Sequence, residues 1–301
     1  MMTTAPSAAG SIARDRFGLG WRPELAAGIF AHLDQIDMLE VIADDYFDVP
    51  RRELSALRTL GAQVPITLHG VGAGLASALP VEQRRLDDLA RVVEVAAPVF
   101  WSEHLAFVRA GNVEIGHLAA PVRNCRTLAG TAENLTRARA TVGAWPAVEN
   151  VATLIDPPGC EMNESDWMLA LCDALPELPL LLDLHNVHAN ALNFGFDAAE
   201  FILQLPLARV GAIHIAGGEW IDAGSVAGER RLLDDHLHPV PEPVYELLRF
   251  VAAHAPQPLN VLLERDGAYP PMPELLREIA AARAAVARGR AEAAAALHQP
   301  A

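Results

Sequence analysis

The chain has 301 residues, of which 51% are hydrophobic, so it is long enough for one large domain or two small ones. Its formal net charge of −15 argues against nucleic acid as a partner, because neutralising phosphates requires clustered basic side chains. All 23 basic side chains are Arg, and the lack of Lys excludes Schiff-base chemistry, pyridoxal phosphate attachment and a P-loop, which all need an ε-amine.

The beginning of the chain and its cysteines bear on the compartment. Residues 1–16 contain no apolar stretch typical of a secretion signal, and no run approaches the ~18 apolar residues of a membrane-spanning helix. Cys125, Cys160 and Cys172 show no CxxC spacing, so neither a disulfide framework nor a zinc ribbon is indicated. We therefore expect a soluble, cytoplasmic protein that binds no membrane.

Short apolar segments, often β-branched, alternate along the chain with segments of helical periodicity. The predicted strands are 17–21, 38–43, 65–70, 99–105, 146–151, 180–186, 210–217 and 259–266. The predicted helices include 80–97, 132–142, 164–174, 198–205 and 243–253. Eight strands that alternate with helices predict a parallel sheet, and eight is the number that closes a (β/α)8 TIM barrel. No GxGxxG follows the first strand, so the open dinucleotide-binding fold lacks its signature.

One connection is much longer than the others. It joins the seventh and eighth predicted strands and includes the Gly-rich segment 217–230 and the sequence LDDHLHP at 233–239. Long loops inside a compact domain are usually functional or disordered, and we interpret this one as an active-site loop. We expect three parts in the chain, namely a flexible N-terminus at 1–14, one barrel domain at 15–285 and an Ala-rich C-terminal tail at 286–301.

Seven of the eleven histidines lie in segments that read as strand ends, each beside a carboxylate or an asparagine. These segments are ITLHG, WSEHL, LLLDLHNVH, AIHIAGG and LDDHLHP, and the strand-like AVENV and LLERD add glutamates. The active site of a (β/α)8 barrel lies at the carboxyl ends of its strands. A single His at a strand end is more often a hydrogen-bonded core residue. Six strands that carry such residues at the same end, however, predict a metal site.

Alternation of side chains along a strand narrows the choice of ligands. Only one of Glu103 and His104 can point into the barrel, and we favour His104. Glu149 is the expected inward residue of its strand, while Asp183 and His185 share a face if their strand stays regular. Imidazoles and carboxylates without thiolates disfavour structural zinc and suit iron or manganese with open coordination positions. The candidates are too many for one ion.

The order and spacing of nine motifs resemble a known family. The motifs are GLGWR, LEVIADDYF, ITLHGVGAGLAS, SEHLAF, VENVATLI, LLLDLHNVHANALNFGFD, IHIAGG, LDDHLHPVPEPVYELL and LLERDGAYPP. They are similar to the multinuclear non-haem iron-dependent oxidative enzymes, to which the methanobactin-biosynthesis oxidase belongs. The resemblance implies a TIM barrel with two or three iron ions, in mixed Fe(II)/Fe(III) states, that uses dioxygen to oxidise a ribosomally synthesised peptide. It also implies a Cys-containing precursor peptide as substrate and, in many members, a small partner protein that presents it.

Carried over position by position, the resemblance implies a set of metal ligands. They are His69, His104, Glu149, Asp183, His214, Asp234, His236 and Glu264. Asp183, Asn186 and His188 are the candidate catalytic residues; His188 is either a further ligand or a polar wall residue. The chain departs from the family at Asp44–Asp45, where a Glu-Asn pair is common, and at His185 and His188, where Asn and Tyr are common.

The resemblance leads to a working hypothesis. A substrate thiolate binds one iron, oxygen is activated at the same or a neighbouring iron, and the carbon next to sulfur loses hydrogen. Arg265 and Asp266 either anchor the peptide or form a loop salt bridge. A first alternative is a divalent-metal TIM-barrel isomerase or an endonuclease IV-like phosphodiesterase, although the acidic chain argues against the nuclease. A second is a non-catalytic metal-binding scaffold, against which open coordination positions argue, because structural sites are closed.

Overall fold

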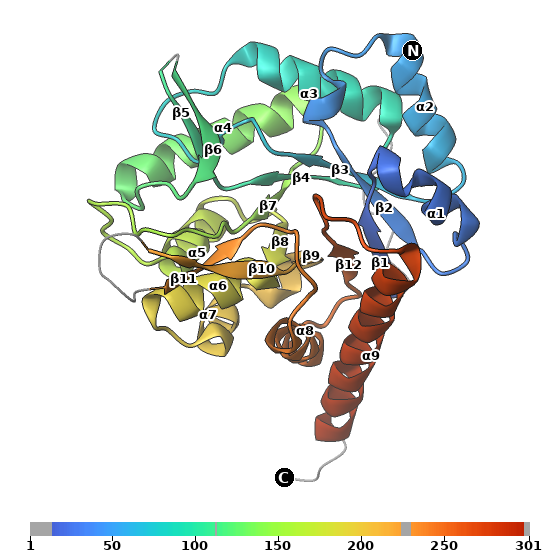
Figure 1. The fold of residues 1–301 in the computed structure, drawn as a ribbon. Helices are drawn as coiled ribbons and strands as arrows, with labels where there is room; N and C mark the ends of the chain where they lie inside the picture. The colour runs from blue at the N-terminus through green and yellow to red at the C-terminus, as the bar shows by residue number, and fades with distance from the viewer. Residues whose placement is uncertain (1–13, 112, 224–229, 298–301) are drawn as a thin grey trace.

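Eight parallel strands form a closed barrel in the order β1-β12-β9-β8-β7-β4-β3-β2 (Figure 1). The computed structural model describes residues 14–111, 113–223 and 230–297. The barrel strands are β1 Arg16–Gly20, β2 Met38–Ile42, β3 Ile66–Gly70, β4 Trp101–His104, β7 Ala147–Glu149, β8 Leu180–Asp183, β9 Val210–Ile215 and β12 Asn260–Leu263. The predicted (β/α)8 barrel is therefore confirmed.

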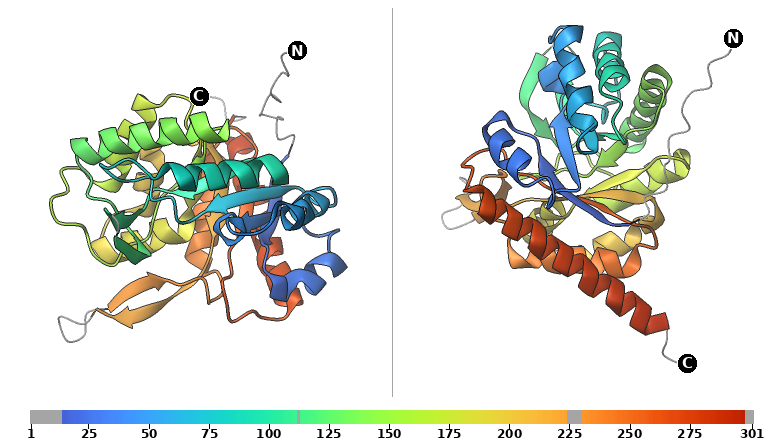
Figure 2. Two further views of the ribbon diagram at one scale, coloured as in Figure 1. Left: turned by 90° about the horizontal axis from the view of Figure 1, so that it is seen from above. Right: turned by 90° about the vertical axis from the view of Figure 1, so that its right-hand side faces the viewer.

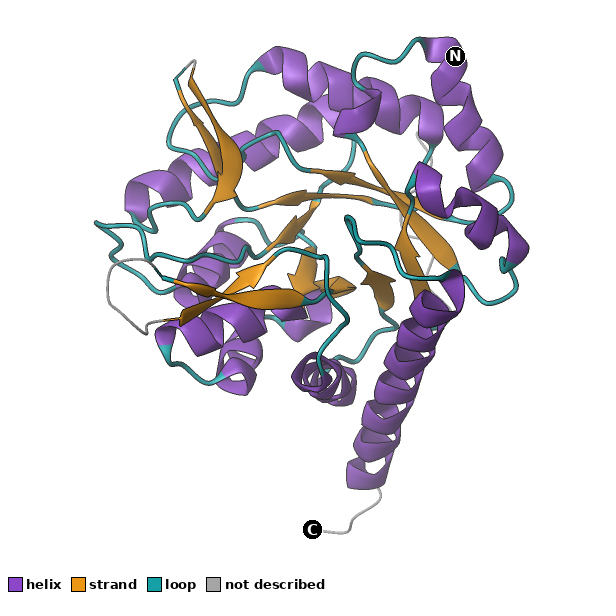
Figure 3. Cartoon of the chain, in the orientation of Figure 1, coloured by secondary structure: helices purple, strands orange, loops and turns teal. Residues whose placement is uncertain are grey.

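The barrel strands are apolar over most of their length because helices cover the sheet on its outer side (Figure 3). Leu180, Leu181 and Leu182 of β8, for example, are each at most 1% exposed. Buried imidazoles and carboxylates interrupt this pattern chiefly in the second half of a strand or directly after it. The sequence thus concentrates its buried polar groups at the carboxyl end of the barrel.

Helices surround the barrel and return the chain from one strand to the next. They are α1 Ala26–Ala31, α2 Arg51–Gly61, α3 Gln83–Ala96, α4 Cys125–Val142, α5 Glu164–Ala174, α6 Leu184–Phe194, α7 Ala198–Gln204, α8 Glu242–His254 and α9 Met272–Leu297, with short 3-10 turns at Pro23–Leu25, Asp44–Tyr46 and Leu207–Arg209. The predicted helix 164–174 is found unchanged. The helix predicted at 132–142 begins earlier, at Cys125, because Asn124 and Thr127 form a capping box around its first turn.

The predicted strand 180–186 is too long. The strand ends at Asp183, whose side chain accepts a hydrogen bond of 2.6 Å from the backbone N–H of Asn186 and so caps helix α6. His185 and Asn186 therefore lie in the first turn of a helix. The expectation that Asp183 and His185 share one strand face is wrong, because a capping carboxylate starts the helix before His185.

Two antiparallel hairpins extend from the carboxyl end of the barrel. The first, β5 Phe107–Ala110 with β6 Val113–Ala119, follows β4, and the second, β10 Gly218–Asp222 with β11 Arg230–Asp234, follows β9 (Figures 1 and 2). The second hairpin lies within the segment predicted as a long active-site loop, so much of that segment is regular structure. The part of it at 224–229 lies outside the described residues.

Helix α9 packs along α8 and extends to Leu297, past residue 286, where a C-terminal tail was expected to begin (Figure 2). Its Gly289 permits this packing, because a Cβ there would meet the Cβ of Ala252 at 2.9 Å. The expected flexible N-terminus lies almost entirely outside the described residues. Within the described part of the chain, no helix combines the length and the apolar character needed to cross a membrane.

Candidate metal centre

Glu149, the last residue of β7, is the hub of a buried group of imidazoles. Its Oε2 lies 3.4 Å from His69 Nε2 and 3.5 Å from His104 Nε2, and its Oε1 lies 3.1 Å from His214 Nδ1. These residues come from β3, β4, β7 and β9, whose carboxyl ends meet at one mouth. His104, as favoured over Glu103, is the residue that turns toward Glu149. The donor atoms of His69, His104 and Glu149 all lie within 4.8 Å of one another, as a shared metal ion requires.

A second group shares Glu149 with the first. It consists of Glu149, Asp183, His214 and Glu264, all buried, with donor atoms within 4.8 Å of one another. His214 Nδ1 lies 3.1 Å from Glu264 Oε2, which follows β12. Because Glu149 belongs to both groups, the arrangement suits two neighbouring ions that share this carboxylate.

Asp234 and His236 lie beside these groups rather than within them. His236 Nε2 is 2.9 Å from Asp234 Oδ2 and 3.8 Å from Glu264 Oε2. His236 has a φ of 56°, a left-handed conformation that non-glycine residues rarely adopt. Its backbone is held there by hydrogen bonds from its N–H to Gly217 O at 3.1 Å and from Asp266 N–H to its carbonyl at 3.0 Å. Asp234 and His236, at the end of the second hairpin, thus add two further donors, of which His236 lies farther from Glu264 than His214 does.

Each imidazole of the centre has one ring nitrogen near a carboxylate of the cluster and the other held by an outer partner. The outer contacts are His69 Nδ1 to Ser102 Oγ at 2.8 Å, His104 Nδ1 to Gly70 O at 3.3 Å, His214 Nε2 to Glu40 Oε2 at 3.0 Å and His236 Nδ1 to Asp266 Oδ2 at 2.9 Å. Metal-binding histidines normally have such a partner, which fixes the tautomer and the ring orientation. The four contacts therefore match the pattern of metal-bound imidazoles.

Glu40, in the middle of β2, belongs to the site and was missed from the sequence. It is 1% exposed, and its carboxylate forms a further group with His69 and His214. No His or Asn stands beside it in the sequence, so the pattern that identified the other residues does not apply. The only sequence signal is a single carboxylate within the otherwise apolar strand MLEVI.

Asparagines fix Asp183 in place. The Asn150 side chain accepts from Asp183 N–H at 2.9 Å and donates to Asp183 O at 3.0 Å, and Asn186 Nδ2 donates to Asn150 O at 3.0 Å. Asn186 therefore lies next to a candidate ligand, as expected. His188 does not join the groups; its ring lies 6.3 Å from that of His185, and burial, assisted by His185, lowers the pKa of His188.

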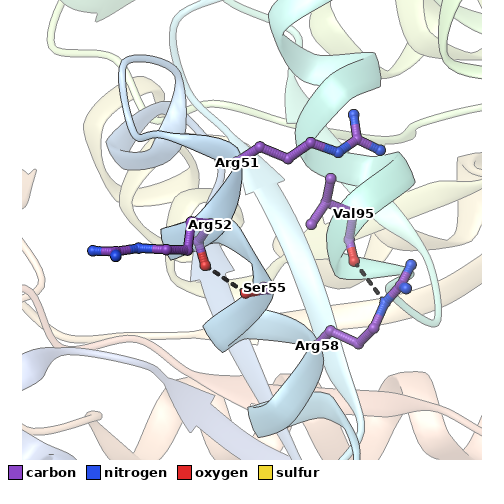
Figure 4. A pocket seen from close by; sticks show the side chains of 5 residues that line it. All are labelled: Arg51, Arg52, Ser55, Arg58 and Val95. Atoms are coloured by element: carbon purple, nitrogen blue, oxygen red, sulfur yellow. Dashed lines mark hydrogen bonds between the residues drawn. The ribbon is translucent and has the colours of Figure 1, made fainter.

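Arg265, Asp266 and His238 lie around the centre and do not belong to its donor groups. Arg265 pairs with Glu278 at 3.1 Å, which confirms the salt-bridge alternative for Arg265. Asp266 binds His236 and pairs with Arg22. His238 Nδ1 lies 3.1 Å from Asp235 in a part-exposed group with Glu219 at the surface. A hollow between α2 and α3, lined by Arg51, Arg52, Ser55, Arg58 and Val95, contains no imidazole or carboxylate and lies outside the centre (Figure 4).

The electrostatics of the cluster test whether a cation fits. Burial, together with Glu264 and Asp183 and against His214, raises the pKa of Glu149 to about 8. Burial, together with Asp234 and Glu264, raises the pKa of Asp183 to about 7. Burial lowers the pKa of His69 and, to about 4, that of His104. Protein groups alone thus leave too little positive charge beside Glu149 and Asp183 to keep both ionised at neutral pH, although His214 and His236 outweigh burial and lower the pKa of Glu264.

Buried polar atoms without a hydrogen-bond partner also indicate that a cation fits here. His69 Nε2, Glu149 Oε2, Asp183 Oδ2 and Asn186 Oδ1 are buried and have no hydrogen-bond partner. Leaving such atoms unpaired in the interior is costly, and all four can act as electron-pair donors to a cation. Nitrogen and oxygen donors without thiolate suit iron or manganese. The residues present therefore fit a metal centre of more than one ion.

The chain is similar to several known proteins. A family model described as "RiPP precursor modification enzyme MbnB/TglH/ChrH" matches residues 16–287. A UPF0276 protein of Streptomyces avermitilis is 36% identical over 273 residues, which cover 88% of this chain and 54% of that protein. The chain thus spans about half the length of this relative. A UPF0276 protein of Bordetella parapertussis is 33% identical over 280 residues, covering 93% of this chain and 95% of that protein.

Solved structures with the same fold are more distant. D-psicose 3-epimerase from Clostridium cellulolyticum has a TM-score of 0.57 and 11% identity, covering 92% of this chain and 99% of that one. Endonuclease IV from Thermus thermophilus has a TM-score of 0.54 and 14% identity, covering 90% of this chain and 99% of that one. At such identities the likeness shows the shared barrel alone, because one fold hosts many chemistries.

Proposed function

Because the chain belongs to the MbnB/TglH/ChrH family of RiPP precursor modification enzymes, we propose that it is an iron- and dioxygen-dependent enzyme that oxidises a ribosomally synthesised precursor peptide at a cysteine. The observation that carries the proposal is the buried pair of donor groups joined through Glu149. A multinuclear centre of imidazoles and carboxylates with open positions is typical of oxygen-activating iron enzymes.

Two of the ions would be held by the groups that share Glu149. His69, His104 and Glu149 would hold one, and Glu149, Asp183, His214 and Glu264 would hold the other. Asp234 and His236 would complete the second site or hold a third ion beside Glu264. When bound, iron supplies Lewis acidity toward a substrate thiol and one-electron chemistry with dioxygen.

The side chains themselves perform three tasks. The outer partners Ser102 and Glu40 hold His69 and His214 so that each keeps one nitrogen free for the cluster. Glu149 and Asp183, together with His214 and His236, would release protons when a cation enters, because their pKa values in the metal-free protein are raised. Burial of these residues excludes water from the reacting atoms.

Apolar side chains on the hairpins support a peptide or protein partner at the mouth. Val113 and Ile115 on β6 are 61% and 42% exposed, and Trp220 on β10 is 44% exposed. Exposed apolar side chains near a site commonly mark a binding surface. We propose that the Cys-containing precursor is bound here, presented by a small partner protein.

The test uses protein reconstituted with ferrous iron without oxygen and a Cys-containing peptide encoded beside its gene, with the partner protein where one is encoded there. We expect two or more irons per chain and a change in peptide mass that requires both iron and oxygen. His214→Ala should abolish the conversion, whereas His254→Ala, at an exposed position on α8, should not. Two irons per chain with no change in peptide mass would contradict the proposal, and selective binding of magnesium or zinc would favour an isomerase or phosphodiesterase.

A further inference from the structure

His185 is fully buried in the first turn of α6 and lies against the end of the second hairpin. Its Nδ1 is 2.6 Å from Asp234 Oδ1. A carboxylate only accepts hydrogen bonds, so the imidazole must carry its proton on Nδ1 and donate it to Asp234. The other oxygen of Asp234, Oδ2, is left facing His236 Nε2 at 2.9 Å.

The adjacent Cε1–Nε2 edge of the same ring faces Gly218. A Cβ at Gly218 would meet His185 Cε1 at 2.7 Å and Nε2 at 3.1 Å, so only glycine lets the strand lie this close to the ring. Gly218 and Asp234 are paired across the hairpin. His185 therefore contacts both members of the pair from which β10 and β11 extend.

His185 is not placed as a metal ligand. Within the described part of the chain, no group of three or more donor residues with atoms within 4.8 Å of one another includes His185, and its Nδ1 is taken up by Asp234. Its Nε2 is buried without a hydrogen-bond partner and lies 3.1 Å from the position that a Cβ at Gly218 would take. The only contact of His185 with the centre is thus the hydrogen bond to Asp234.

We propose that His185 is a positioning residue, which holds one oxygen of Asp234 so that the other is directed into the metal centre. This inference rests on the proposed metal-dependent function. It ties the orientation of Asp234 to α6.

A purely structural role is the competing explanation, because α6 also holds the hairpin through Asn193. The Asn193 side chain donates to Leu232 O at 3.0 Å and accepts from Leu232 N–H at 2.8 Å. Asn193 lies two helical turns after His185, on the same side of α6. Without His185, the hairpin would therefore stay attached to α6 through Asn193, but Asp234 would be free to rotate. Measuring metal affinity distinguishes this reorientation of Asp234 from a general loosening of the hairpin.

The test measures ferrous iron bound per chain by anaerobic equilibrium dialysis of the metal-free protein, for the parent and for His185→Asn, His185→Gln and His185→Leu. Asn places its amide N–H close to the position of Nδ1, whereas Gln places it close to that of Nε2. We expect the Asn variant to bind iron as the parent does. The Gln and Leu variants should bind one equivalent about ten- to a hundredfold more weakly, the usual effect of losing an outer partner of a ligand. His254→Leu is the control and should match the parent.

The outcomes separate the two proposals. Equal affinity in the parent and the Leu variant, or equal losses in the Asn and Gln variants, would overturn the role of His185 and leave the proposed function standing. A parent protein that binds no iron would overturn both. If the Leu variant does not fold, the Asn and Gln variants decide, because both keep a polar side chain at this position and differ in where the donor lies.

Discussion

The metal centre has two halves that are held in different ways. His104 and Glu149 are register partners in the parallel sheet, and so are Asp183 and His214, so the barrel itself sets their separation. Asp234 and His236 come from the end of a hairpin and are held by side chains such as His185 and Asp266. The barrel half is fixed by the fold, whereas the hairpin half depends on individual hydrogen bonds.

This difference indicates which half of the metal centre can change its geometry. Backbone register shared by eight strands cannot change locally without breaking the barrel, because each strand is paired on both sides. A hairpin of two strands lacks that constraint and is only marginally stable by itself. We therefore expect the barrel half to keep its metal when residues of the hairpin half are substituted. The hairpin half should determine whether the last ion binds or which coordination positions stay open.

The largest effect should come from removing the hub of the barrel half. Glu149→Gln keeps the size of the side chain but removes the charge shared by both groups, so both ions should be lost or bound more than about a hundredfold more weakly, beyond the effect of an outer partner. The measurement is iron per chain after anaerobic reconstitution. Glu246→Gln, at an exposed site on α8, is the matched control. Full iron content in Glu149→Gln would show that Glu149 does not join the groups.

A smaller, local effect should follow from changing the hairpin half. Asp234→Asn should weaken one iron equivalent by about ten- to a hundredfold, the range seen for changes around a metal site, and leave the other in place. Asp222→Asn, an exposed residue of the same hairpin, should bind iron as the parent does. Loss of all iron in Asp234→Asn would mean that the two halves are not separable.

The metal-free protein should become less stable as the pH rises from about 6.5 to about 8. The folded state keeps protons on Glu149, with a pKa of about 8, and on Asp183, with a pKa of about 7, whereas the unfolded chain has already lost them. Against burial, carboxylates raise the pKa values of His214 and His236, which act in the same direction above the ordinary histidine value of 6.5. Burial lowers the pKa values of His69 and His104, which oppose the trend only weakly because the unfolded chain loses these protons just above pH 6.5. A loss of about 2 kcal/mol in the free energy of unfolding is expected from Glu149. Urea unfolding measures it, and bound metal should remove the dependence; a stability that rises with pH would contradict it.

The smallest effect should come from loosening the hairpin alone. Asn193→Ala removes two hydrogen bonds to Leu232 and should cost about 1–3 kcal/mol locally. Because the barrel is not involved, the melting temperature should change little while proteolysis within the hairpin becomes faster. Equal changes in both would show that the hairpin unfolds together with the barrel.

The sequence predicts the two halves unequally. Apolar strands that end in His, Glu or Asp predict that these side chains gather at one mouth, and in the structure they do lie together there, because parallel strands bring their carboxyl ends together whatever the details of packing. Glu40 was missed because it lies within a strand and reaches the site through a partner, His214, that is 174 residues away. Long-range side-chain contacts of this kind leave no local pattern.

The hairpin half of the centre also depends on long-range contacts that the sequence does not reveal. The sequence placed Asp234 and His236 in a long connection interpreted as an active-site loop, and the family resemblance implied that they are ligands. It indicated neither the β10–β11 pairing nor the contact of His185 with Asp234. The error at 180–186 had a local cause, since one residue, Asp183, both ends a strand and caps a helix. Because Asp183 fits both the end of a strand and the cap of a helix, the predicted strand was extended to residue 186 instead of ending at Asp183.

The most direct test of the centre is X-ray absorption at the iron edge of the anaerobically reconstituted protein. The shared position of Glu149 predicts at least two irons per chain and an iron–iron distance of about 3.5–4 Å, as in other two-metal sites. Glu149→Gln should abolish that signal. A single iron per chain, with no neighbouring iron detected, would contradict a multinuclear centre.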